Sequence, residues 1–422
     1  MKIKKDLINL LDEVIENKKY SNLQLKYIFD NNTYNKKEKA FLNNMLNVTL
    51  KNLIYIDYAI SKLARSVKRK TRQILRLSIA QLIYTDADDA GVIYEAVELG
   101  KEENVFQANF INSFLRNFEK NKKDIYDLAP DHIKISYPLW FYEKVKNQFG
   151  EDKYIDVLNR YKGKSFFSVR VNHNNLSKDD FLDLLKLVDS EILWNVSDVY
   201  YLNNNNILKT KAYLIGDVVI QDGSSLLVVD MLSPKETDIV LDVAAAPGGK
   251  SLAILQKYRP KKLIATDIHE HKVKILKEFE KDYLNFEAKL ADGRTFSEGI
   301  YDKILLDVPC SGLGVLTKKP EKVYEIDLKI IKAIKKLQKK IFDNTYTLLK
   351  QGGEMVYSTC TILENENTNN VSYFLEKYKD LEVVDYEFPK DVIVIKDEFG
   401  GNLISYENKY LDGFYMIKFK KK

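Results

Sequence analysis

The sequence predicts a multidomain chain: an all-helical domain, a small α+β module and a doubly wound α/β domain of the Rossmann-like type. Three observations predict this arrangement. At 422 residues the chain is too long for one hydrophobic core, and its 45% apolar content can fill several. Apolar residues recur at helical spacing over about the first 120 residues. After Ser233, short apolar strands alternate with amphipathic helices.

The first domain, residues 1–127, is predicted to be all-helical. Its apolar residues are spaced three and four positions apart, and no strand-like alternation of comparable length interrupts them. The polar run from Glu119 to Asp124, followed by Pro130, is typical of a linker. We therefore expect the helical domain to end near this run.

Residues 128–232 are predicted to form linker helices followed by a small α+β module. Helical spacing resumes at 139–148 and 154–161. Three short segments with the composition of strands then surround a helix at 178–188. These segments lie at 166–171, 199–202 and 218–220.

The third domain, residues 233–422, is predicted to contain a parallel sheet, because compact apolar strands alternate with longer helices. The clearest strands lie at 239–243, 263–266, 303–306 and 354–357. In an open parallel sheet, ligands bind outside the carboxyl ends of the strands. The residues that directly follow each strand are therefore the candidate site.

Composition favours a cytoplasmic protein that does not cross a membrane. The amino terminus has the charged pattern of an amphipathic helix and lacks the apolar block of a signal peptide. No apolar run approaches the roughly 20 residues of a membrane helix. Cys310 and Cys360 are the only cysteines, so we expect two free thiols in a reducing compartment.

The basic excess is concentrated near the amino terminus. The net charge is +5, and residues 1–130 carry 22 basic and 17 acidic side chains, which accounts for the whole excess. Four of the nine arginines lie within twelve positions, with no acid between them. Such a cluster is typical of a surface that binds a phosphate backbone. The residues predicted to bind nucleic acid are Arg65, Lys68, Arg69, Lys70, Arg72 and Arg76.

The segment after the first strand of the third domain has the features of a cofactor turn. Its paired glycines allow a tight turn and bring a ligand close to the backbone at a helix amino terminus. The end of the segment imitates the phosphate-binding loop of ATPases, but that motif requires glycine at the position of Ala244. The residues predicted to contact the cofactor are Ala245, Ala246, Pro247, Gly248, Gly249 and Lys250.

Two aspartates follow the next two strands. Asp267 ends the second strand, where an acidic residue can accept hydrogen bonds from both ribose hydroxyls of an adenosyl cofactor. Asp292 ends a weaker third strand and is expected to accept one from the adenine amino group. Either aspartate alone would more often cap a helix. Both of them, in order behind the glycine turn, predict a cofactor site.

The two cysteines also lie just past strands. The fourth strand ends in Asp307-Val-Pro-Cys310 and the fifth in Ser358-Thr-Cys360, and we expect these strands to be neighbours. A free cysteine is often only a small buried hydrophobe. Both cysteines of this chain lie at strand ends of the predicted cofactor-binding sheet. This placement predicts a chemical role for them.

This ordered set of motifs resembles the RNA cytosine-5 methyltransferases of the Sun type. The resemblance implies a class I methyltransferase domain that uses S-adenosylmethionine and no metal. It extends to Val169-Arg-Val-Asn172, which matches the family's RNA-binding module and implies that Arg170 binds RNA. Lys70–Arg76 and Phe110–Phe118 resemble the NusB-like domain of the RsmB-type branch, whose substrate is bacterial 16S ribosomal RNA.

The resemblance assigns roles within the site. A thiolate must add to carbon 6 of cytosine before carbon 5 can accept a methyl group. The family implies that Cys360 attacks, that Cys310 assists product release and that Asp307, beside the cofactor, holds the base. Lys250 would help to lower the pKa of the attacking thiol. Related DNA enzymes attack from the Pro-Cys position, and the sequence alone leaves the two thiols interchangeable.

Alternatives remain open at this point. Without catalysis, a NusB-like domain would indicate an RNA-binding assembly or antitermination factor, and the same chemistry could act on transfer RNA. The lysines between Lys318 and Lys340 could line an RNA path or be a solvated face. We expect a monomer that acts on free or early small-subunit 16S ribosomal RNA.

Overall fold

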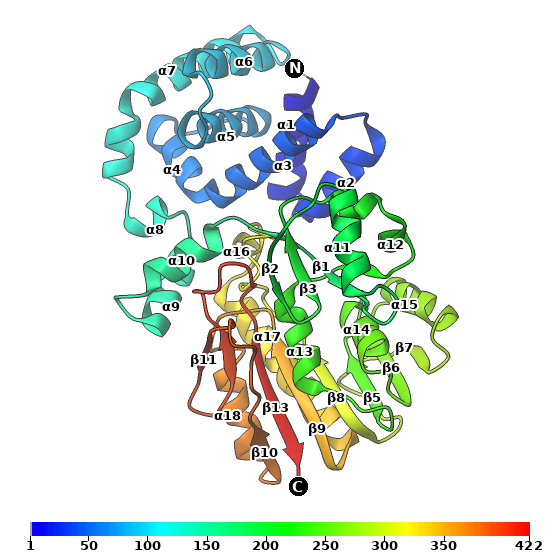
Figure 1. The fold of residues 1–422 in the computed structure, drawn as a ribbon. Coiled ribbons are helices and arrows are strands. Elements are labelled where there is room, and N and C mark those ends of the chain that lie inside the picture. Colours follow the sequence, from blue (N-terminus) through cyan, green and yellow to red (C-terminus); the bar gives the residue numbers. More distant parts are fainter. Residues whose placement is uncertain (1) are drawn as a thin grey trace. The chain divides into compact units, whose positions relative to one another are not determined.

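The computed structural model describes residues 2–422 and divides into two compact units (Figure 1). The helical unit runs to Lys162 and includes Lys318–Asp327. The second unit consists of Gly163–Thr317 and Leu328–Lys422. The linker helices after residue 127 therefore pack with the helical unit, and the small module shares a unit with the α/β domain. Across the described residues, no helix has both the length and the apolar character that a membrane crossing requires.

The helical unit consists of amphipathic helices that bury their apolar faces in one core, as predicted. Leu7, Leu46 and Leu75 are completely buried there. Capping stops the chain from fraying at several helix starts: Asn35 and Glu38 form a capping box at α3, and Asn104 caps α7. The helices are α1 Lys2–Ile15, α2 Ser21–Asn31, α3 Lys36–Lys51, α4 Leu53–Leu63, α5 Arg69–Tyr84, α6 Asp89–Lys101, α7 Val105–Asp127, α8 Asp131–Lys134, α9 Leu139–Phe149, α10 Tyr154–Lys162 and α16 Lys322–Glu325.

The predicted linker at Glu119–Asp124 is wrong, because α7 continues through it to Asp127. Phe118 and Ile125 are buried on one face of the helix, while the polar residues between them occupy the other faces. A polar run six residues long is therefore compatible with an uninterrupted helix, since the two buried apolar residues that flank it are about two turns apart.

Arg76 lies inside the helical unit and is 4% exposed. Its guanidinium donates to both carboxylate oxygens of Asp57, at 2.7 Å each, and to Glu16 Oε1 at 2.8 Å. This fork ties α5 to α4 and to the end of α1. Because the charge is buried and fully paired, the contact is structural.

Arg76→Ala is expected to destabilise the helical unit by about 3 kcal/mol, because it leaves two carboxylates without their buried partner. Hydrogen exchange of the α5 amides measures the change. Arg69→Ala is the matched control, since Arg69 pairs with Asp12 at the exposed start of the same helix, and should lower protection far less. Equal losses in the two variants would contradict the structural role of Arg76.

The small module is a four-stranded antiparallel sheet, with the order β2-β3-β1-β4 among the described residues. Its strands are β1 Phe167–Val171, β2 Ile192–Val196, β3 Val199–Leu202 and β4 Val218–Ile220, and its helices are α11 Lys178–Leu187, η1 Asn206–Lys209 and α12 Lys211–Leu214. The three predicted strands are confirmed. Strand β2 was not predicted, because its apolar run is short and is interrupted by a polar residue; it pairs with β3 through the tight turn at Ser197. Lys257 Nζ pairs with Asp198 and Asp230, each at 2.9 Å, and so ties this module to the α/β domain.

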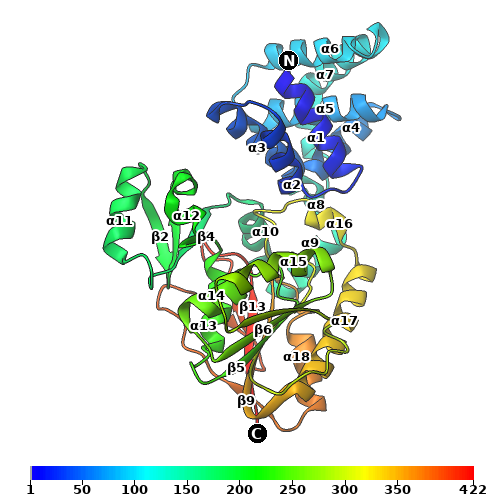
Figure 2. The ribbon, with the colours of Figure 1, turned by 90° about the vertical axis from the view of Figure 1, so that its right-hand side faces the viewer.

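The α/β domain is confirmed as a doubly wound sheet. The parallel strands lie in the order β7-β6-β5-β8-β9, and antiparallel β13 pairs with β9. Helices α13 and α14 cover one face, and α17 and α18 the other (Figure 2). The strands are β5 Ile239–Val243, β6 Lys262–Asp267, β7 Phe286–Leu290, β8 Tyr301–Asp307, β9 Leu349–Thr359, β10 Leu381–Val384, β11 Val394–Lys396, β12 Asn402–Ile404 and β13 Tyr415–Lys421. The helices are α13 Gly223–Leu232, α14 Gly249–Lys257, α15 Glu270–Lys277, η2 Glu278–Lys281, α17 Leu328–Leu348 and α18 Thr368–Lys377.

The chain order reverses between β5 and β8. From β5 it proceeds outward through β6 and β7, and it then returns to the other side of β5 with β8 and β9. Such a switch point opens a crevice at the carboxyl ends of the two central strands. The loops after β5, β6, β8 and β9 therefore converge on one site.

Candidate functional site

The two thiols meet at the carboxyl ends of adjacent parallel strands. In the β8–β9 pair Asp307 lies opposite Ser358, so the loops that follow leave the sheet at the same level. Cys310 Sγ and Cys360 Sγ are 2.7 Å apart, and the Cys360 amide donates to Cys310 Sγ at 3.2 Å. Both cysteines are free and partly exposed. The predicted proximity of the strands is confirmed, and it makes the two thiols one chemical unit.

Lys250 and Asp307 form an ion pair beside the thiols. Lys250 Nζ donates to Asp307 Oδ2 at 2.6 Å, and Ser358 Oγ donates to Asp307 Oδ1 at 2.8 Å. Lys250 Nζ also lies over the ring of Phe414, 5.2 Å from its centroid. Burial alone would lower the pKa of Lys250, but the Asp307 carboxylate reverses this effect and raises it. The lysine is therefore a fixed positive charge in the site.

The two thiols differ in electrostatic surroundings. The hydrogen bond with Cys360, followed by burial, raises the pKa of Cys310 well above the ordinary value for a thiol. The nearby carboxylates of Glu366 and Asp307 act in the same direction. The raised pKa disfavours a Cys310 thiolate, while the positive charge of Lys250 acts on Cys360.

The glycine turn places backbone at the start of α14. Gly248 has φ +100°, and a Cβ there would collide with Phe279 and Leu276, so glycine is required for packing as well as conformation. A Cβ on Gly249 would meet only Gln221 Nε2, at 3.8 Å, so this face is open to a ligand. Gln221 Nε2 donates to the Gly249 carbonyl at 3.2 Å and holds the turn in place. Ala245, Ala246 and Pro247 precede this turn and are at least partly exposed.

Asp267 is the last residue of β6 and is 4% exposed. Its Oδ1 accepts from the amide of His269 at 2.9 Å, while Lys272 Nζ is 3.9 Å from Oδ2. The carboxylate thus has remaining acceptor capacity at the edge where a ribose would lie beside the open glycine turn. These residues fit an adenosyl cofactor.

Asp292 follows β7 at the same edge, but Arg294 folds back onto its carboxylate. The Arg294 amide donates to Oδ1, and its Nε donates to both oxygens, each at 2.9 Å. These bonds hold the pKa of Asp292 below its usual value. An adenine amino group would share this carboxylate with Arg294, a partner that the spacing of the aspartates did not indicate.

Asp242, the penultimate residue of β5, lies just before the glycine turn and was not predicted to belong to the site. It is 1% exposed; Ser251 Oγ donates to its Oδ2, and its Oδ1 has no partner among the described residues. Burial raises its pKa from 3.8 to about 7, against the opposing effects of Ser251 and Lys250. Its position directly before the glycine turn could have indicated from the sequence that it lies near the site.

The predicted nucleic-acid contacts separate into two groups. Arg65 and Lys68 are exposed, and Arg72 is half-buried. Arg69 donates to both oxygens of Asp12, and Lys70 pairs with Glu103. These pairs are exposed, so a phosphate could compete for the two cations.

Two members of that set require correction. Arg76 is buried against Asp57 and Glu16, as described above, and cannot reach a phosphate. Arg170 is 2% exposed on β1, where its Nε donates to Gln221 Oε1 at 2.6 Å. Burial lowers the pKa of Arg170 to about 10. Arg170 therefore contacts Gln221, which in turn hydrogen-bonds to the glycine turn, and it does not present a charge at the surface.

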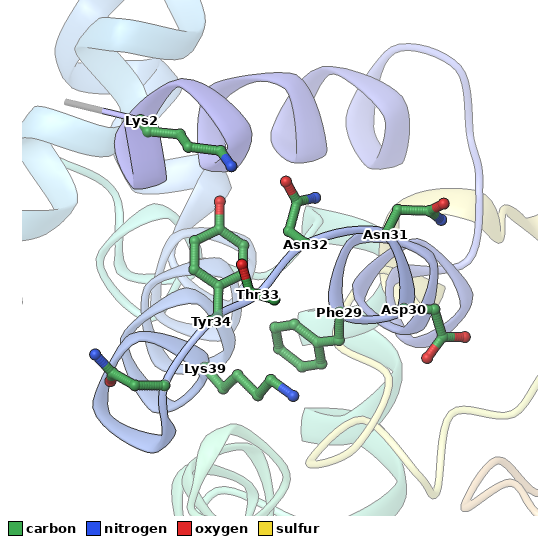
Figure 3. A pocket seen from close by; sticks show the side chains of 9 residues that line it. Lys2, Phe29, Asp30, Asn31, Asn32, Thr33, Tyr34 and Lys39 are labelled. Carbon is green, nitrogen blue, oxygen red and sulfur yellow. The ribbon is translucent and has the colours of Figure 1, made fainter.

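A hollow of about 750 Å³ lies in the helical unit, near the start of α1 and the turn between α2 and α3 (Figure 3). Lys2 Nζ lies 5.7 Å from the ring centroid of Tyr34, and Lys39 Nζ lies 5.4 Å from that of Phe29. Its other lining residues are Asp30, Asn31, Asn32, Thr33 and Asn35. This set contains no thiol or imidazole, so the reactive groups described above remain those of the sheet edge.

Stability should depend on pH through Asp242. A folded-state pKa raised above 3.8 means that stability is fully present below that pH and is lost as pH rises through about 7. Asp242→Asn removes this dependence, so its stability relative to the wild type should rise by about 2 kcal/mol between pH 5 and pH 8. Denaturant unfolding at both pH values, without cofactor, measures the difference. The same difference at both pH values would contradict the assignment.

Comparison with known proteins agrees with this geometry. The family described as 16S rRNA methyltransferase RsmB/F matches residues 229–420, and the NusB family matches residues 1–120. A probable ribosomal RNA small subunit methyltransferase B of Bacillus subtilis is 31% identical over 395 residues, covering 89% of this chain and 88% of the relative. Ribosomal RNA small subunit methyltransferase B of Yersinia enterocolitica is 29% identical over 83% of this chain and 84% of its own length.

A solved structure of a methyltransferase homologue from Pyrococcus horikoshii has a TM-score of 0.61 and 24% identity, covering 70% of this chain and 100% of that one. This likeness concerns the fold. The Bacillus subtilis relative, matched over 89% of this chain, and the two matched families show the family. The chain therefore belongs to the 16S rRNA methyltransferase RsmB/F family of S-adenosylmethionine-dependent enzymes and carries a NusB-type helical domain.

Proposed function

We propose that this enzyme methylates carbon 5 of one specific cytosine in 16S ribosomal RNA, through a covalent bond between Cys360 and carbon 6. The observation that carries the proposal is the pair of thiols at adjacent strand ends, 2.7 Å apart, beside the Lys250–Asp307 pair. The names of the curated relatives support the small-subunit substrate. We further propose that it acts in the cytoplasm, as a monomer, on free or early small-subunit RNA.

We assign the attack to Cys360 because the raised pKa of Cys310 disfavours its thiolate. Carbon 5 of cytosine is a poor nucleophile until a thiolate adds to carbon 6. Lys250 supplies positive charge near Cys360, and a protonated Cys310 would donate its S–H to an attacking Cys360 sulfur across the 2.7 Å that separates the two. S-adenosylmethionine, when bound, would supply the electrophilic methyl group.

Asp307 orients the base. Its carboxylate, fixed by Ser358 and Lys250, can accept a hydrogen bond from the exocyclic amino group of cytosine. As the thiolate adds, negative charge develops at N3, and the fixed positive charge of Lys250 beside Asp307 stabilises it.

Release requires two bonds to break. A base takes the proton from carbon 5, the 5,6 double bond re-forms, and the bond from Cys360 to carbon 6 breaks. Cys310 keeps its proton and donates a hydrogen bond to the departing sulfur, which leaves as a thiolate; the 2.7 Å approach of the two sulfurs permits this contact. The free thiolate of Cys360 is then ready for another cycle.

Removing each thiol should leave a different species. Cys360→Ala should bind RNA and cofactor but form neither product nor adduct, since the nucleophile is lost. Cys310→Ala should still attack and methylate but release slowly, so methylated RNA should accumulate on Cys360. Denaturing electrophoresis of labelled RNA, with and without cofactor, measures the adduct.

A cofactor-dependent adduct in Cys360→Ala that is absent from Cys310→Ala would reverse the roles of the two thiols. Offering 16S ribosomal RNA and transfer RNA side by side to the wild type tests the substrate. Methylation of transfer RNA alone would overturn the proposed substrate, and binding without methylation of either would favour a non-catalytic RNA factor.

RNA contacts are proposed for the exposed part of the arginine cluster and for α17. Arg65, Lys68 and Arg72 stay in the proposed set because, in the part of the chain that the structure describes, no acid is paired with them, in contrast to Arg69 and Lys70. Helix α17 buries Ile331 and Gln338 on one face and exposes a row of lysines on another. That row is Lys329, Lys332, Lys336 and Lys340.

Changing Arg65, Lys68 and Arg72 together to alanine should weaken RNA binding and lower its salt dependence by about two units of slope, as expected for three lost phosphate contacts. Binding titrations at several salt concentrations measure both quantities. The matched control changes Lys26, Lys36 and Lys37, which are also exposed on the helical unit. Equal losses in both triple variants would mean that only total charge matters.

A further inference from the structure

A buried polar network lies beneath the two thiols, and the mechanism above does not use it. Glu366 and Gln338 are completely buried, and Asn367 is 2% exposed. Glu366 and Asn367 are adjacent in the turn that leads from Cys360 to α18. The two side chains contact different cysteine loops.

Glu366 holds the residues on both sides of Cys310. Its Oε2 accepts from the amide of Ser311 at 3.0 Å and from Gln338 Nε2 at 3.0 Å. The same Gln338 nitrogen donates to the Pro309 carbonyl at 2.9 Å. The loop that carries Cys310 is therefore fixed immediately before and after the thiol.

Asn367 does the same for Cys360. Its Oδ1 accepts from Thr359 Oγ1 at 2.6 Å, and its Nδ2 donates to the Thr361 carbonyl at 3.0 Å. These partners are the residues directly before and after Cys360. The two loops are also joined to each other, since Ser311 Oγ donates to Thr361 Oγ1 at 3.0 Å.

Burying a carboxylate to hold a loop in place lowers the stability of the fold. Burial raises the pKa of Glu366, against the hydrogen bonds from Ser311 and Gln338. Its Oε1 has no hydrogen-bond partner among the described residues. A buried polar atom without a partner costs stability. Glu366 thus brings a cost, which a function in holding the thiol would explain.

We propose that Glu366 and Asn367 are positioning residues that act on separate steps, Glu366 by holding Cys310 for product release and Asn367 by holding Cys360 for attack. This inference rests on the proposed roles of the two thiols. It predicts that the RNA adduct accumulates when Glu366 is changed and falls when Asn367 is changed. A general loss of structure would not move the adduct in opposite directions.

Glu366→Ala should accumulate the cofactor-dependent RNA adduct about tenfold above the wild type, because a displaced Cys310 slows release. Asn367→Ala should instead lower adduct and product together, also by about tenfold. KM for RNA and cofactor affinity should change little in either variant, and kcat should fall. Glu366→Gln keeps an oxygen for the Ser311 amide and should restore most of the release rate.

Glu376→Ala is the matched control, because Glu376 is an exposed glutamate on α18. It should behave as the wild type. If Glu366→Ala does not fold, Glu366→Asp, which retains the charge but withdraws the carboxylate by one methylene, should show a smaller accumulation of adduct. Wild-type adduct levels in folded Glu366→Ala, or in Glu366→Asp if the alanine variant does not fold, would overturn the inference. Equal loss of adduct in Glu366→Ala and Asn367→Ala would also overturn it.

Cys310→Ala separates failure of this inference from failure of the proposed function. If Cys310→Ala accumulates adduct and Glu366→Ala does not, only the positioning role is wrong. If Cys310→Ala itself accumulates none, the assignment of the thiols is wrong.

Discussion

The parallel pairing of β8 with β9 is the constraint on which the site depends. Its register sets Asp307 opposite Ser358, and their side chains hydrogen-bond across the two strands. Each cysteine follows within three residues of this pair, so the thiols can meet without any long loop. The reversal of strand order beside β8 opens the crevice in which Lys250, from the neighbouring turn, reaches Asp307.

The same edge of the sheet concentrates groups that are costly to bury. Within residues 2–422, Asp242 and Glu366 each have a carboxylate oxygen without a hydrogen-bond partner, and burial raises the pKa of both. One lies at the start of the cofactor turn, and the other lies beneath the Cys310 loop. The hydrophobic core of this unit offsets their cost. We interpret these two buried carboxylates as groups that lower the stability of the fold but fix the geometry around the reacting atoms.

Much of this fold could be predicted because periodicity reports burial. The helical unit, three strands of the small module and the parallel sheet all have apolar spacing that matches their structure. The meeting of Cys310 with Cys360 followed from strand order alone. The polar run at Glu119–Asp124 was wrongly predicted to be a linker, because a solvated helix face has the same composition as a linker.

Other features depend on three-dimensional partners that a linear pattern does not contain. Arg76 belongs to a basic cluster in sequence, but its position on α5 turns it toward Asp57 and Glu16. Residues 318–327 pack within the helical unit, where Glu321 accepts from Ser21 Oγ at 2.7 Å, a contact across 300 positions. Glu366 lies in an asparagine-rich run that resembles a surface loop and is nevertheless completely buried.

The central claim is that Cys360, and not Cys310, forms the bond to the base. RNA that carries 5-fluorocytosine at the target position tests it most directly in the wild-type enzyme, because fluorine cannot leave carbon 5 as a proton does and the methylated adduct is trapped. Peptide mass mapping after digestion identifies the modified cysteine. The account predicts a methylated nucleotide on the peptide that contains Cys360, and the same nucleotide on the peptide that contains Cys310 would contradict it.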